Sequence, residues 1–179
     1  IRHATTLVEA GATILDIGGE SSRPGSAPVG EEEEKRRVLP IIEALAKESL
    51  PAFLSIDTYK ASVAKQAIDR GACIINDISA LGDPEMAPLA AKAEAALILM
   101  HMRGTPQTMQ KGEIEYNDVV EDVATFLKER ILAALEAGVS RSKCMVDPGI
   151  GFGKTRDHNL KLTSQLGALL DLGCPIVYG

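Results

Sequence analysis

The sequence lacks three features that would place it in common classes of protein. No apolar run approaches the roughly 20 residues that a membrane-spanning helix needs, so we expect no membrane span. There is no basic excess, since 19 Lys and Arg stand against 25 Asp and Glu for a net charge of -6. Clustered basic residues carry the affinity for nucleic-acid phosphates, so we expect no nucleic-acid partner. The first residues do not resemble a secretion signal.

Cysteine is also scarce. The three cysteines, Cys73, Cys144 and Cys174, are far apart and each lies within or beside an apolar segment. An odd, scattered set suits reduced thiols in a core better than disulfides or a zinc site. We therefore expect a reducing compartment, the cytoplasm or an organelle matrix. The composition, 45% hydrophobic and 25% charged, is that of a soluble globular protein.

Short apolar runs alternate with segments of helical pattern along the whole chain. The runs are predicted to be buried strands and span residues 12–17, 52–57, 72–77, 96–101, 144–147 and 175–179. Helices are expected over residues 1–10, 31–48, 59–70, 84–93, 117–137 and 157–172. Glycine is placed to close four of them, at Gly11, Gly71, Gly138 and Gly173. This alternation predicts an α/β fold with a parallel sheet covered by helices.

The chain opens on a predicted helix and stops on a predicted strand. We therefore expect residues 1–179 to form one partial domain, an incomplete (β/α)8 TIM barrel without its first strand and its C-terminal βα part. A complete barrel of this kind has about 250 residues. An open doubly wound sheet is the alternative.

Polar residues end most of the predicted strands. The carboxyl ends of parallel strands open onto the ligand site, so these residues are expected to converge; they are Asp16, Asp57, Asn76, Asp77, His101 and Asp147. Any single aspartate could instead cap the next helix. Asp57 and Asp147 follow apolar residues and need partners with donors, such as adjacent N–H groups of a flat heterocycle. Asn76 can both donate and accept at the edge of such a ring.

Two loops carry further candidates. The stretch GGESSRPG, residues 18–25, follows the first predicted strand and has the composition of an active-site loop, or of a solvated turn. The stretch VDPGIGFGKT, residues 146–155, is rich in glycine, but three residues separate Gly149 from Gly153 and Pro148 stands where a Walker A motif has its first glycine. We expect Lys154 and Thr155 to begin the following helix rather than to contact phosphate.

Five motifs, DIGGESSRPG, SIDT, NDIS, LMHMRGTP and DPGIGFGKT, occur in the order and spacing of one family. The chain resembles dihydropteroate synthase over its whole length. The resemblance implies a TIM barrel that joins 6-hydroxymethyl-7,8-dihydropterin pyrophosphate to p-aminobenzoate, with Mg²⁺ assistance, and releases pyrophosphate. Sulfonamides compete with the aminobenzoate in this family. It also implies a homodimer when the protein is complete.

The resemblance further implies roles for particular residues. Asp57 and Asp147 are the implied catalytic residues, and Asp147 is expected to grip the amide and amino edge of the pterin. The other implied substrate-binding residues are Asn76, Met100, Gly151 and Phe152 for the pterin, and Ser22, Arg23 and Pro24 for p-aminobenzoate. The glycines of DPGIGFGKT are then expected to bring backbone close to a flat ligand, with Phe152 along its face.

Parts of the family pattern are absent from this sequence. The loop with the implied metal ligand lies upstream of Ile1, so no Mg²⁺ ligand is expected in this segment. The SRK segment, with its pterin-contacting lysine, and the later diphosphate-binding residues are absent too, so we expect no turnover from this segment alone. The alternatives are a pterin-binding methyltransferase domain of the corrinoid type, which would not need the ESSRPG loop, and a barrel that binds pterin without catalysis.

Overall fold

The computed structural model describes all residues, 1–179. Helices and strands alternate in the order α1 (Arg2–Glu9), β1 (Ile14–Gly18), α2 (Glu31–Lys47), β2 (Phe53–Asp57), α3 (Ala61–Ile68), β3 (Ile74–Asp77), α4 (Met86–Ala93), β4 (Ala96–Met100), α5 (Val119–Glu136), η1 (Arg141–Lys143), β5 (Cys144–Asp147), α6 (Arg156–Ser164) and η2 (Leu166–Leu172), where η1 and η2 are 3₁₀ helices. Five of the six predicted strands are therefore confirmed. None of the helices is long and apolar enough to cross a membrane.

Two predictions near the C-terminus need correction. Residues 175–179 form no sixth strand but only an isolated bridge between Ile176 and Val146. Their backbone exchanges hydrogen bonds with Val146 alone, because Val146 donates to Pro175 and accepts from Val177, and proline has no N–H with which to extend the pairing. The predicted helix over residues 157–172 is divided at Gln165 into α6 and η2. Gly167 lies in this stretch, and glycine weakens a helix by about 1 kcal/mol.

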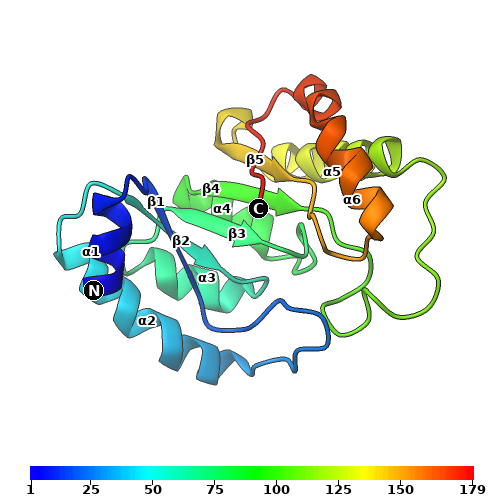
Figure 1. The fold of residues 1–179 in the computed structure, drawn as a ribbon. Helices are drawn as coiled ribbons and strands as arrows, with labels where there is room; N and C mark the ends of the chain where they lie inside the picture. The colour runs from blue at the N-terminus through cyan, green and yellow to red at the C-terminus, as the bar shows by residue number, and fades with distance from the viewer.

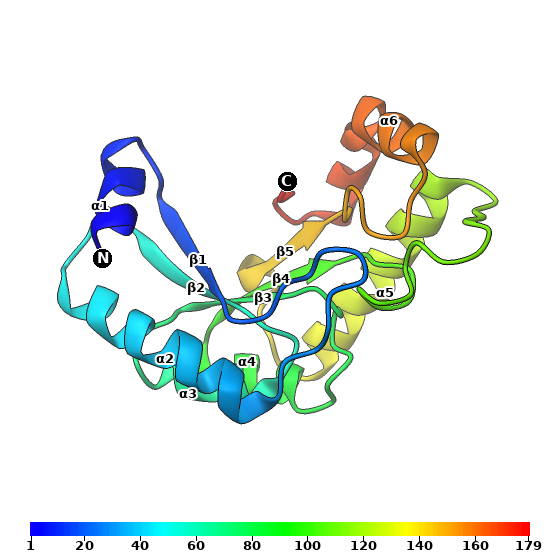
Figure 2. The same ribbon diagram turned by 60° about the horizontal axis from the view of Figure 1, so that its bottom comes forward.

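The five strands form one parallel sheet in the order β1-β2-β3-β4-β5. Strands that follow the chain order without reversal are typical of a (β/α)8 barrel, whereas a doubly wound sheet reverses its order at a switch point. Figure 2 shows the sheet curved, with β1 and β5 rising on either side and α2 to α5 beneath it. Figure 1 shows the same sheet with its helices in chain order, and α6 lies against α5. The doubly wound alternative is therefore wrong.

Strand pairing divides the sheet into two faces. Side chains alternate between faces along a strand, and paired residues of parallel strands share a face. The helix-covered face is almost entirely aliphatic and consists of Leu15, Ile17, Leu54, Ile56, Ile75, Asp77, Leu97, Leu99, Cys144 and Val146. The inner face consists of Ile14, Asp16, Gly18, Phe53, Ser55, Asp57, Ile74, Asn76, Ala96, Ile98, Met100, Met145 and Asp147. Polar residues are thus concentrated on the inner face.

The hydrophobic core lies between the helix-covered face and α2 to α5. It is a cluster of 31 buried residues that runs from Leu15 to Cys174. Burying aliphatic area stabilises the fold by about 25 cal/mol per Å², and this core fixes the strands whose carboxyl ends carry the candidate site. The four glycines predicted to close helices all have positive φ, between 66° and 115°.

All three cysteines are free thiols. Cys144 and Cys174 are buried as expected, but Cys73 is exposed, so the core prediction is wrong for that residue. Cys73 lies just before β3, outside the buried run that begins at Ile74.

Candidate active site

The carboxyl ends of the strands bring four predicted residues onto the inner face. Asp57 pairs with Asn76 across β2 and β3, and Met100 pairs with Asp147 across β4 and β5. The Asn76 Nδ2 donates to Asp16 Oδ2 over 2.9 Å, which fixes which way the amide of Asn76 points. Residues up to 131 positions apart in the sequence, Asp16 and Asp147, therefore share one edge of the sheet.

Asp77 does not belong to this group, so the prediction that it converges with the others is wrong. It immediately follows Asn76, and alternation turns its side chain to the helix-covered face. There it is fully buried. Its carboxylate accepts hydrogen bonds from Ser79 N, Ser79 Oγ and Leu81 N at 2.6–2.9 Å. Asp77 therefore holds the turn after β3, on the face of the sheet away from the other predicted site residues.

Asp57 is half-buried and receives no hydrogen bond from the protein. Burial, together with the nearby carboxylates of Asp16, Glu34, Glu20 and Asp77, raises the pKa of Asp57 to about 7. A carboxyl group without internal donors is suited to accept N–H groups from outside the chain. Its raised pKa also makes it sensitive to the charge of whatever lies beside it.

Asp147 has one of its oxygens engaged. Its Oδ1 accepts from Gly149 N at 2.7 Å, and no donor reaches its second oxygen. Burial raises the pKa of Asp147, although the Gly149 N–H and the positive charge of Lys154 act in the opposite direction. The carboxylate is thus held in place from one side and remains open on the other.

The glycines of residues 147–155, the Gly-rich loop, differ in what lies around them. A Cβ at Gly149 would lie 1.9 Å from His101 O, and one at Gly153 would lie 2.6 Å from the Arg103 Cβ. Both glycines therefore allow close packing on the segment after β4. Of the three, only Gly151 faces open space, and the close approach of this backbone to a ligand stays a prediction.

Lys154 is a buried residue with several hydrogen-bond partners, a structural role that the sequence pattern did not predict. Its side chain is buried, and Nζ lies 2.9 Å from His101 Nδ1 and 2.9 Å from Gly149 O. The carbonyls of Phe152 and His101 also accept from it. Burial lowers the pKa of Lys154 to about 7, while Asp147 acts to raise it. The ammonium thus holds the Gly-rich loop together.

His101 and Thr155 behave as structural residues. Burial, and then the charge of Lys154, lowers the pKa of His101 to about 3, so its ring is neutral and its Nδ1 can accept from the ammonium. Thr155 caps α6: its Oγ1 accepts from His158 N, and the His158 ring in turn accepts from Thr155 N. The prediction that Thr155 begins the helix is confirmed, whereas it is wrong for Lys154, which precedes the cap and bonds within the loop.

The loop after β1, residues 19–30, carries Ser22, Arg23 and Pro24. Arg23 and Pro24 are exposed and Ser22 is half-buried. Gly25 N donates to Pro106 O over 2.9 Å, so this β1 loop meets the loop after β4 (residues 101–118), and Figure 2 shows it passing over the carboxyl edge of the sheet. The roles predicted for Ser22, Arg23, Pro24 and Phe152 in ligand binding stay predictions.

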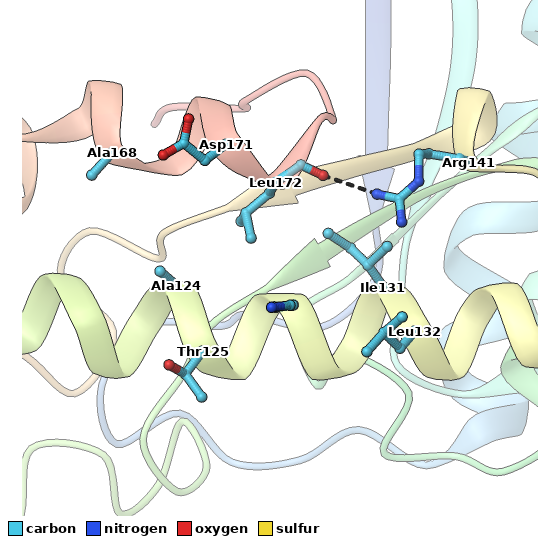
Figure 3. Close-up of a pocket in the computed structure, with 9 residues that line it drawn as sticks. Ala124, Thr125, Ile131, Leu132, Arg141, Ala168, Asp171 and Leu172 are labelled. Atoms are coloured by element: carbon cyan, nitrogen blue, oxygen red, sulfur yellow. Dashed lines mark hydrogen bonds between the residues drawn. The ribbon is translucent and has the colours of Figure 1, made fainter.

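A separate pocket lies between α5 and η2, away from the predicted site residues. Ile131, Leu132, Arg141 and Leu172 are among its lining residues, and the Arg141 Nη1 donates to Leu172 O over 2.9 Å (Figure 3). No predicted site residue lines it.

The fold is that of an α/β protein of the barrel type, and its inner face carries the carboxylates of Asp16, Asp57 and Asp147 at the carboxyl ends of the strands. The family described as pterin binding enzyme matches residues 1–179, and the chain belongs to this family.

Relatives of known function are similar along the whole chain. The dihydropteroate synthase of Escherichia coli K12 is 41% identical over 179 residues, which are all of this chain and 63% of that protein. A crystal structure of Yersinia pestis dihydropteroate synthase with a sulfonamide drug complex has a TM-score of 0.95 at 42% identity, covering 99% of this chain and 64% of that one. The Xanthomonas albilineans enzyme in complex with 7,8-dihydropteroate has a TM-score of 0.87 at 40% identity and covers 99% and 62%. The chain thus spans less than two thirds of these relatives, and the prediction of a partial TIM barrel is confirmed.

Proposed function

We propose that the protein is a dihydropteroate synthase, a transferase of folate biosynthesis, and that this chain supplies its pterin site. The observation that carries the proposal is the common placement of Asp57, Asn76 and Asp147 on the inner face, with acceptor oxygens that the chain itself leaves open. Similarity to synthases that bind a sulfonamide drug and 7,8-dihydropteroate supports the same assignment.

In this proposal the pterin ring lies against the carboxyl edge of the sheet. Asp147 accepts the amide and amino N–H groups of the ring through its open oxygen, and Asp57 and Asn76 bind other polar atoms of the bicycle. Met100, Gly151 and Phe152 complete the apolar contact. Asp16 acts indirectly, because its hydrogen bond orients the amide of Asn76.

The second substrate, p-aminobenzoate, is proposed to bind beside the β1 loop. Ser22, Arg23 and Pro24 lie close in sequence to Gly25, which contacts the β4 loop. Arg23 is exposed and positively charged, which suits the carboxylate of the aminobenzoate.

The proposed reaction is a substitution at the CH₂ group attached to the pterin. The amine nitrogen of p-aminobenzoate forms a bond to this carbon, the carbon–oxygen bond breaks, and its electron pair leaves with pyrophosphate, while the amine loses a proton. The protein supplies no nucleophile. It holds the two reactants in line, and Asp57 and Asp147 favour a ring that gains positive charge as the bond breaks.

Mg²⁺ stays a proposal for the full protein. No group of three His, Cys, Asp or Glu residues in this chain could hold a metal ion, and the carboxylate of Asp16 already accepts a hydrogen bond from the amide of Asn76. The residues present therefore do not form a magnesium site by themselves, and the roles proposed above for Asp57 and Asp147 do not require one.

Further parts of the proposal concern the whole protein. We propose that it is a cytoplasmic homodimer with small-molecule substrates and no nucleic-acid partner. The acidic charge of -6 supports the absence of a nucleic-acid partner.

The test is a turnover assay on the full-length protein. It is incubated with 6-hydroxymethyl-7,8-dihydropterin pyrophosphate and p-aminobenzoate, and pyrophosphate release and dihydropteroate are measured together. Both products should appear in equal amounts. Pterin binding by calorimetry without turnover would favour a non-catalytic barrel, and methyl transfer from a methylated pterin would favour the corrinoid-type methyltransferase.

A further inference from the structure

The carboxylate of Glu20 joins both ends of the β1 loop. Glu20 stands at the start of the loop, and its Oε2 accepts from Val29 N, nine residues later, over 2.9 Å. Between these two points, residues 21–28 make mainly contacts within the loop itself, such as Ser26 N to Arg23 O at 3.1 Å. The exception is Gly25, which donates to Pro106. Glu20 therefore closes the loop at its base.

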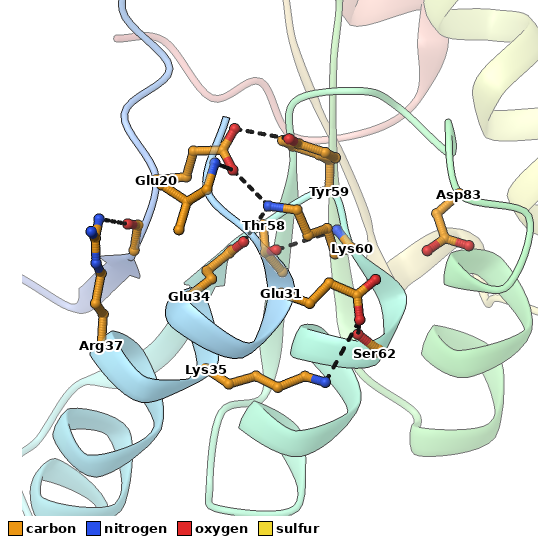
Figure 4. A network of polar contacts seen from close by, with 12 residues as sticks. Glu20, Glu31, Glu34, Lys35, Arg37, Thr58, Tyr59, Lys60, Ser62 and Asp83 are labelled. Atoms are coloured by element: carbon orange, nitrogen blue, oxygen red, sulfur yellow. Dashed lines mark hydrogen bonds and ion pairs between the residues drawn. The ribbon is translucent and has the colours of Figure 1, made fainter. Parts of the chain in front are cut away.

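The same carboxylate ties the loop to the segment after β2. The Lys60 Nζ lies 2.6 Å from Glu20 Oε2, and the Tyr59 hydroxyl donates to Glu20 Oε1 over 2.8 Å. Figure 4 shows Tyr59 and Lys60 converging on Glu20, while Lys60 also reaches Glu34 on α2. One side chain thus receives three donors from two segments.

The network is largely shielded from water. The side chains of Glu20, Lys60 and Glu34 are 11%, 14% and 1% exposed. Burial acts to raise the pKa of Glu20, but Lys60, the Val29 N–H and the Tyr59 hydroxyl outweigh it, and the pKa is lowered. Glu20 is therefore a carboxylate throughout the neutral range, and salt screens its ion pair with Lys60 less than it screens an exposed pair.

The network also adjoins the candidate site. A small pocket is lined by Glu20, Ser22, Glu34, Asp57 and Tyr59, among others. A side chain of the β1 loop, Ser22, thus shares a wall with the inner-face carboxylate Asp57. The position of the loop base therefore determines where Ser22 lies relative to Asp57.

We propose that Glu20 is a positioning residue, whose carboxylate closes the base of the β1 loop and fixes where the loop presents Ser22 and Arg23 to the second substrate. The presentation of a substrate rests on the proposed function, whereas the ordering of the loop does not. Glu20 does not itself touch the reacting atoms in this proposal.

The test variant is Glu20→Gln in the full-length protein. Glutamine keeps the shape and one acceptor oxygen but removes the charge, and Lys60 keeps Glu34 as a partner, so the variant is expected to fold. Tyr59→Phe removes one donor and serves as a milder second variant. The matched control is Glu32→Gln on α2, because Glu32 is 89% exposed and pairs only with Lys35.

Two measurements separate loop ordering from catalysis. Amide hydrogen exchange over residues 21–29 should become at least about tenfold faster in Glu20→Gln, less so in Tyr59→Phe, and should not change in Glu32→Gln. In the turnover assay the KM for p-aminobenzoate should rise about 5- to 20-fold, with the KM for the pterin substrate within about twofold of the parent.

The exchange and KM measurements can each overturn the proposal. Unchanged exchange in Glu20→Gln overturns the proposal, as does faster exchange in an active enzyme whose KM for p-aminobenzoate stays the same. Equal increases in both KM values would indicate general damage and also overturn it. If the parent protein has no synthase activity, the proposed function fails, and the exchange result alone then decides whether Glu20 orders the loop.

Discussion

The two faces of the sheet use acidic side chains in opposite ways. On the helix-covered face, Asp77 is fully buried and accepts three hydrogen bonds from the turn that follows it. On the inner face, Asp57 and Asp147 keep acceptor oxygens that no group of the chain reaches, and burial raises the pKa of both. A carboxylate that is satisfied by its own chain stabilises the fold, whereas one left open costs stability and is available for a ligand.

The largest expected effect is on stability, and it contrasts the two faces within a single strand. Ile56 is completely buried on the helix-covered face, whereas Phe53, on the same strand, is 64% exposed on the inner face. In the chain of residues 1–179, Ile56→Ala should lower the free energy of unfolding by about 4 kcal/mol. Phe53→Ala should lower it by less than about 1 kcal/mol. Urea denaturation measures both.

The variants Ile56→Ala and Phe53→Ala can also be compared in the full-length protein. If further chain covers the inner face, the cost of Phe53→Ala should rise toward that of Ile56→Ala. Equal costs for the two variants within residues 1–179 would show that the two faces are not distinguished as described.

The next effect is on ligand binding. Asp147→Asn keeps the oxygen that accepts from Gly149 but loses the charge that is proposed to grip the pterin edge. We expect pterin affinity in the full-length protein to fall roughly 100- to 1,000-fold, or about 3–4 kcal/mol. Calorimetry measures it, with Asp171→Asn on the surface of η2 as the control. Near-normal affinity for Asp147→Asn would refute the role assigned to Asp147.

A smaller effect is expected for the aspartate on the other face. Asp77→Ala leaves the N–H groups of Ser79 and Leu81 without acceptors in a buried turn, so the free energy of unfolding should fall by about 2–3 kcal/mol. Pterin affinity of the folded protein should stay within about threefold of the parent. Thermal denaturation and calorimetry together test this, and a selective loss of pterin affinity would place Asp77 in the site after all.

The sequence predicted the positions of the strands but not the face on which each strand-end residue lies. The apolar runs located five strands, because short buried strands need continuous aliphatic residues whatever surrounds them. They could not separate Asn76 from Asp77, since both end the same run and only the pairing register decides which of them faces the helices.

The Gly-rich loop shows a second limit. Gly149, Gly151 and Gly153 all have positive φ, but the composition of the loop does not indicate which groups approach them. Gly149 packs on the carbonyl of His101, 48 positions earlier, and the ammonium of Lys154 is held by carbonyls of the same region. Contacts to backbone carbonyls leave no pattern in the side-chain sequence, so nothing in the stretch predicted a buried lysine.

The smallest predicted effect depends on pH. It tests whether the Asp57 carboxylate, which receives no hydrogen bond from the chain, lowers the stability of the folded protein. The pKa of Asp57 is about 7 in the folded protein, whereas the ordinary pKa of an aspartate is 3.8. Between these values the folded protein keeps a proton that the unfolded chain has released. The contribution of Asp57 to the free energy of unfolding is therefore fully present below about pH 4 and is lost as the pH rises to 7. Above pH 7 this contribution no longer changes. Asp57→Asn cannot ionise, so it should escape this loss.

The stability of Asp57→Asn relative to the parent should accordingly grow between pH 4 and 7 and level off above. The full difference between the two pKa values would correspond to about 4 kcal/mol. Asp57 is only half-buried, and water on the inner face screens its charge, so we expect a gain of about 1–2 kcal/mol. Urea denaturation at several pH values measures it. If the difference in free energy of unfolding between Asp57→Asn and the parent stayed constant from pH 4 to 8, ionising Asp57 would cost the unliganded protein no stability. The inner face would then differ from the helix-covered face in geometry alone.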